Sequence, residues 1–488
     1  MNTCTTPQFL SLALLSAGLL SLAGPAHAGN FVGDGHDDLL VGAPGEALGV
    51  GPRSGAAFLY RGYGYGMAGV AVLDQGGLDV DELGDEFGSA FACGDFDGDG
   101  ELDLAIGAPG EVVPHGPRSG AVFVYSGTGA VMEGAGLRPA LMLDQSGLGL
   151  DEWGDRLGES MVAADFDGDG FDDLAVGAPG EGYGPTPAVG AVVVYRGSPI
   201  GLVPGQILDQ SDLGLAQAGD LFGSALAAGD FDGDGLFDLA VGAPGEDVGE
   251  ARSAGLVYVF GGTTAGLVPD FVLDQAPLGA DEAGDWFGAA LRAGDFDGDG
   301  YQDLAVGAPG EAPGDAPNGG AVFVFRGGPA SLIAEQVLSQ RELDHVEAGD
   351  QFGAALTSGD YNGDGRDELA VGAPGENLPD APDSGAVYVF RGDRSELVPL
   401  QRITQAGLGS DERFDQFGAA LASGDFLGDS RRDLAIAAPG ETRGSAAPSG
   451  SVYLYRGTAL GLLGARQLDQ YSLERNEAGD MFGAALSD

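Results

Sequence analysis

Residues 294–311 read Gly-Asp-Phe-Asp-Gly-Asp-Gly-Tyr-Gln-Asp-Leu-Ala-Val-Gly-Ala-Pro-Gly-Glu. Counted from Asp295, carboxylates stand at positions 1, 3, 5 and 9, and glycines stand at positions 4 and 6. Alternating carboxylates on a tight turn converge on one point, which suits a hard cation that takes about six to eight oxygen ligands. The glycines reach backbone angles that other residues resist, and position 7 offers its carbonyl oxygen. We therefore predict a calcium loop. Position 12, where an EF-hand carries glutamate, is Val306, so the loop is not an EF-hand.

Versions of this loop recur along the chain, and five of them keep an oxygen at every ligand position. Four carry the full carboxylate set with a position-7 carbonyl: Asp95, Asp97, Asp99, Glu101 and Asp103; Asp165, Asp167, Asp169, Phe171 and Asp173; Asp230, Asp232, Asp234, Leu236 and Asp238; and Asp295, Asp297, Asp299, Tyr301 and Asp303. The fifth has Asp360, Asn362, Asp364, Arg366 and Glu368. We expect all five to bind calcium, because carboxylates so close together repel one another without a cation. The alternative is a set of acidic surface hairpins without metal.

Two further copies of the loop are degraded. The first has Asn30, Val32, Asp34 and Asp38, and the seventh has Asp425, Leu427, Asp429 and Asp433. An apolar residue removes the position-3 oxygen in both, so we expect weaker binding. In the seventh copy Ser430 replaces a glycine, and the adjacent Arg431 and Arg432 offer positive charge in place of the cation. The sequence is compatible with weak calcium binding by these two loops and also with no calcium binding.

The loop belongs to a long internal repeat. Gly-Ala-Pro-Gly-Glu, or a close variant, begins at Gly42, Gly107, Gly177, Gly242, Gly307, Gly372 and Ala437, in steps of 65, 70, 65, 65, 65 and 65 residues. A second motif, Gly-Asp-x-Phe-Gly, is centred with variants on Phe87, Leu157, Phe222, Phe287, Phe352, Phe417 and Phe482. Units of this length exceed solenoid repeats and fit the four-stranded blades of a propeller. We predict an all-β, seven-bladed β-propeller.

Four strands fit one repeat, and the two ends of the chain complement each other. In the copy that begins at Phe287 we predict strands over 287–294, 304–308, 320–326 and 336–340, because β-branched and aromatic residues favour strands. The chain stops at residues 482–488, a first strand without its loop, whereas residue 29 lies within a repeat, at the metal loop. We therefore expect the last strand to complete the first blade and to close the ring, which leaves no open sheet edge between the first and last blades.

These motifs resemble a known family. Phe-Gly, followed by Gly-Asp-x-(Asp/Asn)-Gly-Asp-Gly-x-x-Asp-Leu and Val-Gly-Ala-Pro, is similar to the FG-GAP repeat of the integrin α-subunit N-terminal propeller. Similar repeats occur in glycosylphosphatidylinositol-specific phospholipase D and in secreted bacterial proteins. The resemblance covers residues 29–488 and implies calcium in the loop between strands 1 and 2, with ligands commonly met on the opposite face. It indicates the fold more strongly than the function.

The amino terminus and the composition indicate an exported protein. Residues 1–28 lack charged side chains, contain an apolar run from Phe9 to Leu22 and end in Ala26-His27-Ala28, which is typical of a signal peptide. The apolar run is shorter than 18 residues, so we expect no membrane span here or later. The formal net charge is −54, which makes nucleic acid and anionic membranes poor partners, and we expect no nucleic-acid partner. We expect a secreted or cell-envelope protein and a monomer.

No recognisable catalytic constellation is present. The acids of Gly-Asp-x-Phe-Gly and Gly-Ala-Pro-Gly-Glu recur in all seven units, so we assign them to structure. We expect both Trp153 and Trp286 to be buried between blades. The sequence favours a calcium-binding, non-catalytic adhesion module for an extracellular protein or glycan ligand. The alternatives are an extracellular polysaccharide lyase or hydrolase that uses propeller-face carboxylates, and a calcium-loaded structural protein of an envelope or matrix.

Overall fold

The computed structural model describes residues 29–31, 35–46, 54–64, 66–76, 78–79, 84–113, 118–128, 136–145, 153–182, 186–210, 216–314, 316–329, 332–379, 381–406, 408–442, 449–469 and 480–487. The predicted signal peptide, residues 1–28, lies outside the described residues. Within the described part of the chain, no helix is long and apolar enough to cross a membrane.

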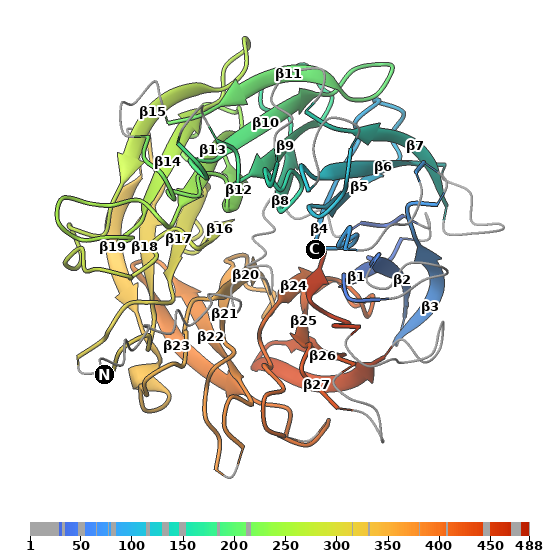
Figure 1. Ribbon diagram of the computed structural model, residues 1–488. Coiled ribbons are helices and arrows are strands. Elements are labelled where there is room, and N and C mark those ends of the chain that lie inside the picture. The colour runs from blue at the N-terminus through green and yellow to red at the C-terminus, as the bar shows by residue number, and fades with distance from the viewer. Residues whose placement is uncertain are drawn as a thin grey trace, which may run out of the picture.

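The described strands form seven four-stranded sheets, arranged as blades around one axis (Figure 1). The first blade contains β28 (Ala485–Leu486), β1 (Leu39–Ala43), β2 (Ala56–Tyr63) and β3 (Gly66–Leu73). Blades two to four contain β4 (Ala90–Gly94), β5 (Asp103–Ala108), β6 (Ala121–Gly127) and β7 (Leu137–Leu143); β8 (Ser160–Ala164), β9 (Asp173–Ala178), β10 (Ala191–Arg196) and β11 (Val203–Leu208); and β12 (Ala225–Gly229), β13 (Asp238–Ala243), β14 (Leu256–Gly261) and β15 (Val268–Leu273). Blades five to seven contain β16 (Ala290–Gly294), β17 (Asp303–Ala308), β18 (Ala321–Arg326) and β19 (Ile333–Leu338); β20 (Ala355–Gly359), β21 (Glu368–Ala373), β22 (Ala386–Asp393) and β23 (Glu396–Ile403); and β24 (Leu421–Gly424), β25 (Asp433–Ala438), β26 (Ser451–Thr458) and β27 (Gly461–Leu468). The predicted seven-bladed propeller is confirmed.

Burial falls from the axis outwards. Strand β12 lies near the centre of the ring and is buried throughout, whereas the outermost β15 of the same blade is mostly exposed (Figure 1). The inner strands are rich in alanine and glycine because seven strands converge near the axis and leave little room for side chains. The core therefore consists of apolar layers between neighbouring blades.

The ring is closed by the last strand, as predicted. Strand β28 pairs antiparallel with β1, with Gly42 opposite Ala485 and Val41 opposite Leu486. The Ser487 hydroxyl also accepts a hydrogen bond of 3.1 Å from the Leu40 amide. The first blade is thus built from both ends of the described chain.

The phenylalanine and glycine of Phe-Gly connect neighbouring blades. Phe287 packs edge-on against Phe323 of its own blade, with ring centroids 5.4 Å apart, while its backbone amide donates to the Ala254 carbonyl of the preceding blade at 2.9 Å. A Cβ atom on Gly307 would lie 2.2 Å from the carbonyl oxygen of Gly353 in the next blade. The two repeated motifs therefore meet where the blade backbones touch, and only glycine fits there.

The observed strands differ from the prediction at the ends. Phe287 precedes β16, because Trp286 and Gly288 adopt positive φ angles of 56° and 86° that break the extended conformation. The fourth strand, β19, begins three residues before the predicted start and ends at Leu338. A register shift between Val324 and Phe325 displaces its pairing with β18. Gln340, predicted to be in this strand, opens the 3-10 helix η3 (Gln340–Glu342).

Candidate metal centres

The predicted metal loops join the first and second strands of each blade, at one end of the ring that we call the lower face. In the four full loops, one carboxylate oxygen each from positions 1, 3 and 5 lie within 4.8 Å of one another: Asp95, Asp97 and Asp99; Asp165, Asp167 and Asp169; Asp230, Asp232 and Asp234; and Asp295, Asp297 and Asp299. Three carboxylate oxygens in this arrangement are a donor set typical of calcium sites. The structure thus brings three of the predicted ligands of each full loop together.

The loop backbone holds these carboxylates in place. Asp95 Oδ1 accepts hydrogen bonds from the Gly98 and Asp99 amides at 2.8 and 3.1 Å, and its Oδ2 accepts from Gly100 at 3.0 Å. Asp97 Oδ1 accepts from the Asp99 amide at 3.1 Å. Gly98 and Gly100 have φ angles of 73° and 87°, which explains the glycines at positions 4 and 6. The turn is therefore fixed by the chain itself.

The position-9 acid lies deeper than the other three. Asp103 is 3% exposed, and its two oxygens accept hydrogen bonds from the Phe96 and Gly127 amides at 3.2 and 2.9 Å. Burial raises the pKa of Asp103 to about 6, and the charges of Asp97 and Asp99 act in the same direction. Burial likewise raises the pKa of Asp303 to about 7. Position 9 therefore ties the loop to the third strand, in addition to its predicted role as a ligand.

The predicted site in the sixth blade, residues 360–368, has the same backbone hydrogen bonds to its position-1 aspartate as the loop that begins at Asp95, but different side chains at positions 3 and 9. Asp360 accepts hydrogen bonds from the loop amides of Gly363, Asp364 and Gly365 at 2.7, 3.0 and 2.8 Å. The longer Glu368 accepts from the Asn362 amide at 3.1 Å and also from its side-chain Nδ2. Burial raises the pKa of Glu368 to about 8. The extra methylene thus brings the position-9 carboxylate up to position 3.

In the degraded seventh loop, an arginine replaces the expected cation contact. Asp429 Oδ2 lies 2.7 Å from Nε and 2.6 Å from Nη2 of Arg456, at the end of the third strand. We predicted Arg431 and Arg432 for this role, but Arg432 pairs instead with Asp37 of the next blade at 3.2 Å. Arg456 stands 27 residues from Asp429, and the β-hairpin brings them together. In the first loop, Val32 and Asp34 lie outside the described residues.

The metal loops contact one another around the ring. The Asp172 amide donates to the Asp95 carbonyl of the preceding loop at 3.1 Å, and Asp172 Oδ2 accepts from the Asp95 amide at 2.9 Å. The position-7 residue packs on the position-4 glycine of the preceding loop: a Cβ atom on Gly98 would lie 2.5 Å from Cε1 of Phe171. Position 7 therefore presents its side chain to a neighbouring loop, a role that the repeat spacing alone does not reveal.

The repeated acids of the other two motifs are structural, as expected. All seven aspartates of Gly-Asp-x-Phe-Gly are buried. A glutamine at the end of the preceding blade contacts several of them or the neighbouring glutamates: Gln75 to Asp85 at 2.6 Å, Gln210 to Glu246 at 2.8 Å, Gln340 to Glu376 at 3.0 Å and Gln405 to Glu441 at 2.7 Å. Burial and the nearby Asp220 raise the pKa of Glu246 to about 7. These acids therefore connect blades and do not serve only the turns of their own blade.

The comparisons with known proteins agree with this geometry. The family model described as FG-GAP repeat matches residues 87–125, 157–195, 222–260, 287–325, 352–390 and 417–455. Each match runs from the phenylalanine of one blade, or from Leu157 in the third blade, through its metal loop to its third strand. The chain is an FG-GAP repeat β-propeller.

Relatives of this FG-GAP propeller carry two kinds of name. Integrin alpha-PS2 of Drosophila melanogaster is 38% identical over 44% of this chain and 15% of its own length. Phosphatidylinositol-glycan-specific phospholipase D of Rattus norvegicus is 40% identical over 55% of this chain and 33% of its own length, and the Homo sapiens protein of that name is 27% identical over 86% and 53%. The chain thus spans a third or less of the first two relatives. A putative 6-phosphogluconolactonase from Bacteroides fragilis has a TM-score of 0.49 at 12% identity, covering 95% of this chain and 99% of that one.

The upper face of the FG-GAP propeller, opposite the metal loops, breaks the sevenfold pattern. Trp153, which we expected to be buried, is 75% exposed, and Phe414 is 57% exposed. Phe414 has a φ of 67° at the position where five described sister repeats have glycine. Both residues lie in the connections between blades, so they face solvent and not the blade interfaces. Comparison of the repeats shows that Phe414 replaces a glycine, but it does not predict that the side chain is exposed.

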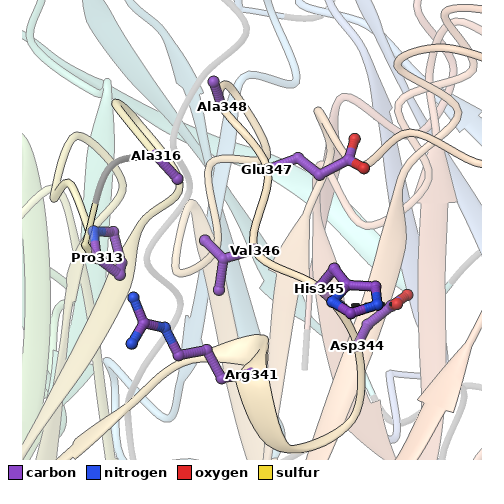
Figure 2. A pocket seen from close by; sticks show the side chains of 8 residues that line it. All are labelled: Pro313, Ala316, Arg341, Asp344, His345, Val346, Glu347 and Ala348. Atoms are coloured by element: carbon purple, nitrogen blue, oxygen red, sulfur yellow. Dashed lines mark hydrogen bonds between the residues drawn. The ribbon is translucent and has the colours of Figure 1, made fainter.

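A shallow groove of about 700 Å³ lies on the same face beside the fifth blade. One wall contains Pro313 and Ala316, and the other is formed by Arg341 and residues 344–348 (Figure 2). Figure 2 shows the Arg341 guanidinium directed toward Pro313, with His345 on the far side. The preceding repeat has Ala276 where this one has Arg341. This departure from the repeat was the sequence signal for the groove, and our sequence reasoning missed it.

Proposed function

We propose that this FG-GAP propeller is an exported, calcium-stabilised binding module that holds a protein or glycan ligand and performs no chemistry of its own. The convergence of three carboxylates in each of the four full loops carries the proposal. Calcium supplies the positive charge that offsets their mutual repulsion. The chain supplies amide hydrogen bonds that fix the loop and a buried position-9 acid that anchors it to the third strand.

Metal binding is coupled to folding in this proposal. A ligand that binds only the folded state stabilises it by mass action, by roughly 2.7 kcal/mol per site at a hundredfold excess over the dissociation constant. Because adjacent loops share hydrogen bonds, such as that between Asp172 and Asp95 at 2.9 Å, ordering one loop also orders its neighbour. A protein of this kind completes its folding after export, where calcium is abundant.

The ligand surface in this proposal is the upper face. Exposed aromatic side chains such as Trp153 provide apolar contact area for a partner. The groove beside Arg341 adds a polar edge, in which Arg341 lies among Asp344, His345 and Glu347. These features differ between blades, as a specific site on a repeat protein requires.

The test is retention on immobilised extracellular proteins and glycans, with calcium and with chelator. We expect retention of the full chain that weakens at least tenfold in the Arg341→Ala or Trp153→Ala variant, while calcium affinity stays unchanged. A panel of polysaccharide and phospholipid substrates, followed by product analysis, tests the enzymatic alternatives. Retention that is absent throughout the panel, or product release by the wild type, would contradict the proposed function.

A further inference from the structure

Near the end of the third strand, the residue before the glycine that bonds the position-9 acid differs between blades. In three blades it is an arginine that reaches the metal loop. Arg326 Nη2 lies 2.8 Å from Asp297 Oδ2 and 2.8 Å from Glu335 Oε1. The other oxygen of Asp297 accepts a hydrogen bond from the Asp299 amide at 2.9 Å. The arginine therefore engages the oxygen of the position-3 carboxylate that the loop backbone leaves available.

The equivalent arginine contacts a loop carboxylate in two other blades, at position 3 in the third blade and at position 5 in the seventh. Arg196 Nε lies 3.6 Å from Asp167 Oδ2 in the third blade, and the Arg196 side chain is 50% exposed. In the seventh blade Arg456 engages Asp429 Oδ2 through two nitrogens, at 2.7 and 2.6 Å. The seventh loop also lacks the position-3 oxygen because it carries Leu427. The guanidinium thus contacts the position-3 carboxylate loosely in the third blade and the position-5 carboxylate closely in the seventh.

The second and fourth blades lack this arginine. Ser126 and Gly261 stand at the equivalent positions, before Gly127 and Gly262, whose amides bond the position-9 acids. Among the described residues, no ion pair reaches the position-3 carboxylate of either loop. These two loops therefore present their carboxylates to a cation without an internal competitor.

We propose that the arginine near the end of the third strand sets the calcium affinity of its blade. The metal loops of blades two and four are then strong sites, and those of blades three and five are weakened. In blade seven the arginine takes the place of the cation. The inference rests on the proposed calcium binding. A guanidinium in contact with a ligand oxygen stands on the order of 5 Å from a bound divalent ion, because calcium–oxygen distances are about 2.3–2.6 Å. Even at the dielectric constant of water, that repulsion weakens binding by about tenfold.

A single tyrosine allows the affinities of two loops to be measured in the full chain. Tyr301 is the position-7 residue of the fifth-blade loop, and its ring packs on Gly233 of the fourth-blade loop, where a Cβ atom would lie 2.3 Å from Cε1. Excitation of Tyr301 therefore sensitises terbium luminescence in both loops. The Tyr301→Phe variant keeps the backbone carbonyl and defines the signal that comes from other tyrosines. Calcium is then titrated against bound terbium.

Reciprocal substitutions exchange the two environments. Arg326→Gly gives the fifth blade the residue of the fourth, and Gly261→Arg does the reverse; a Cβ atom on Gly261 would meet only Asp238 Oδ1, at 3.8 Å. We expect two Tyr301-dependent transitions in the wild type, about tenfold apart in calcium affinity. Arg326→Gly should tighten the weaker transition by about tenfold, and Gly261→Arg should weaken the tighter one by about tenfold.

Arg391→Gly is the matched control. Arg391 occupies the same strand position in the sixth blade, but it pairs with Asp393 at 4.0 Å, and its loop carries the neutral Asn362 at position 3. This variant should leave both Tyr301-dependent transitions unchanged, and far-UV circular dichroism verifies that each variant is folded. Equal calcium constants in wild type, Arg326→Gly and Gly261→Arg would overturn the role of the arginine. Absence of terbium and calcium binding in every protein, wild type included, would refute calcium binding itself.

Discussion

Replacing Gly307 by alanine should destabilise the propeller strongly, because it forces two blades apart. The new Cβ atom would lie 2.2 Å from the Gly353 carbonyl oxygen and 3.2 Å from its carbon, whereas such contacts below 3.0 Å essentially never occur. Overpacking typically costs about 1–3 kcal/mol. Both opposing atoms belong to the backbone of the neighbouring blade and cannot rotate away, so we expect a loss of about 3 kcal/mol, at the upper end of that range.

Gly349→Ala is the control for this experiment. Gly349 has a φ of 91°, but a Cβ atom added there would meet no other atom within 4 Å, so alanine suffers only left-handed strain. That strain costs about 1–2 kcal/mol, and the equivalent Phe414 shows that a side chain is accommodated. Urea unfolding at saturating calcium, followed by circular dichroism, measures both variants. A Gly307→Ala loss no larger than that of Gly349→Ala would refute the tight contact between blades.

Three further predictions concern strain, protonation and metal. Phe414→Gly should raise the free energy of unfolding by about 1 kcal/mol by relieving left-handed strain, and a lower stability in urea unfolding would contradict this. In the folded protein the pKa of Glu246 is raised to about 7, whereas the unfolded chain releases this proton above pH 4.5. The free energy of unfolding therefore falls as the pH rises from 4.5 to about 7. Glu246→Gln should flatten that fall in pH-dependent melting, by about 1.4 kcal/mol per unit of pKa shift, and an unchanged slope would contradict the prediction. Asp232→Asn should reduce the calcium-induced rise in stability by roughly 2.7 kcal/mol at a hundredfold excess of calcium, and Asp425→Asn should reduce it far less; equal losses would show that the seventh loop binds as well as the fourth.

Most of the fold was predictable because it depends on spacing along the chain. Five of the six steps between repeats are 65 residues, and the glycines of the two motifs recur in most repeats. The close approach of Gly307 to Gly353 shows why these glycines recur. The loop geometry was predictable for the same reason, since Asp95, Asp97 and Asp99 are neighbours in sequence. Features that depend on neighbouring residues or on a constant spacing can therefore be predicted from the sequence.

What escaped prediction depends on contacts between strands and blades. The Arg456 guanidinium reaches Asp429 because a hairpin places the third strand over the metal loop. Arg431 contacts Asp429 through its backbone amide, and the Arg432 side chain pairs with Asp37. Gln405 reaches Glu441 across a blade boundary at 2.7 Å. Trp153 was expected to be buried between blades, yet the connection between blades holds it in solvent. Side-chain reach and loop path decide these features, and neither follows from the repeat.

Calorimetric titration of the metal-stripped chain with calcium, with thermal melts alongside, tests the central claim most directly. The four convergent triads and the loop that begins at Asp360 predict four to five bound calcium ions per chain and a large rise in the melting temperature. The heats should show more than one affinity class. Binding of one ion or none, with an unchanged melting temperature, would contradict calcium stabilisation of the propeller.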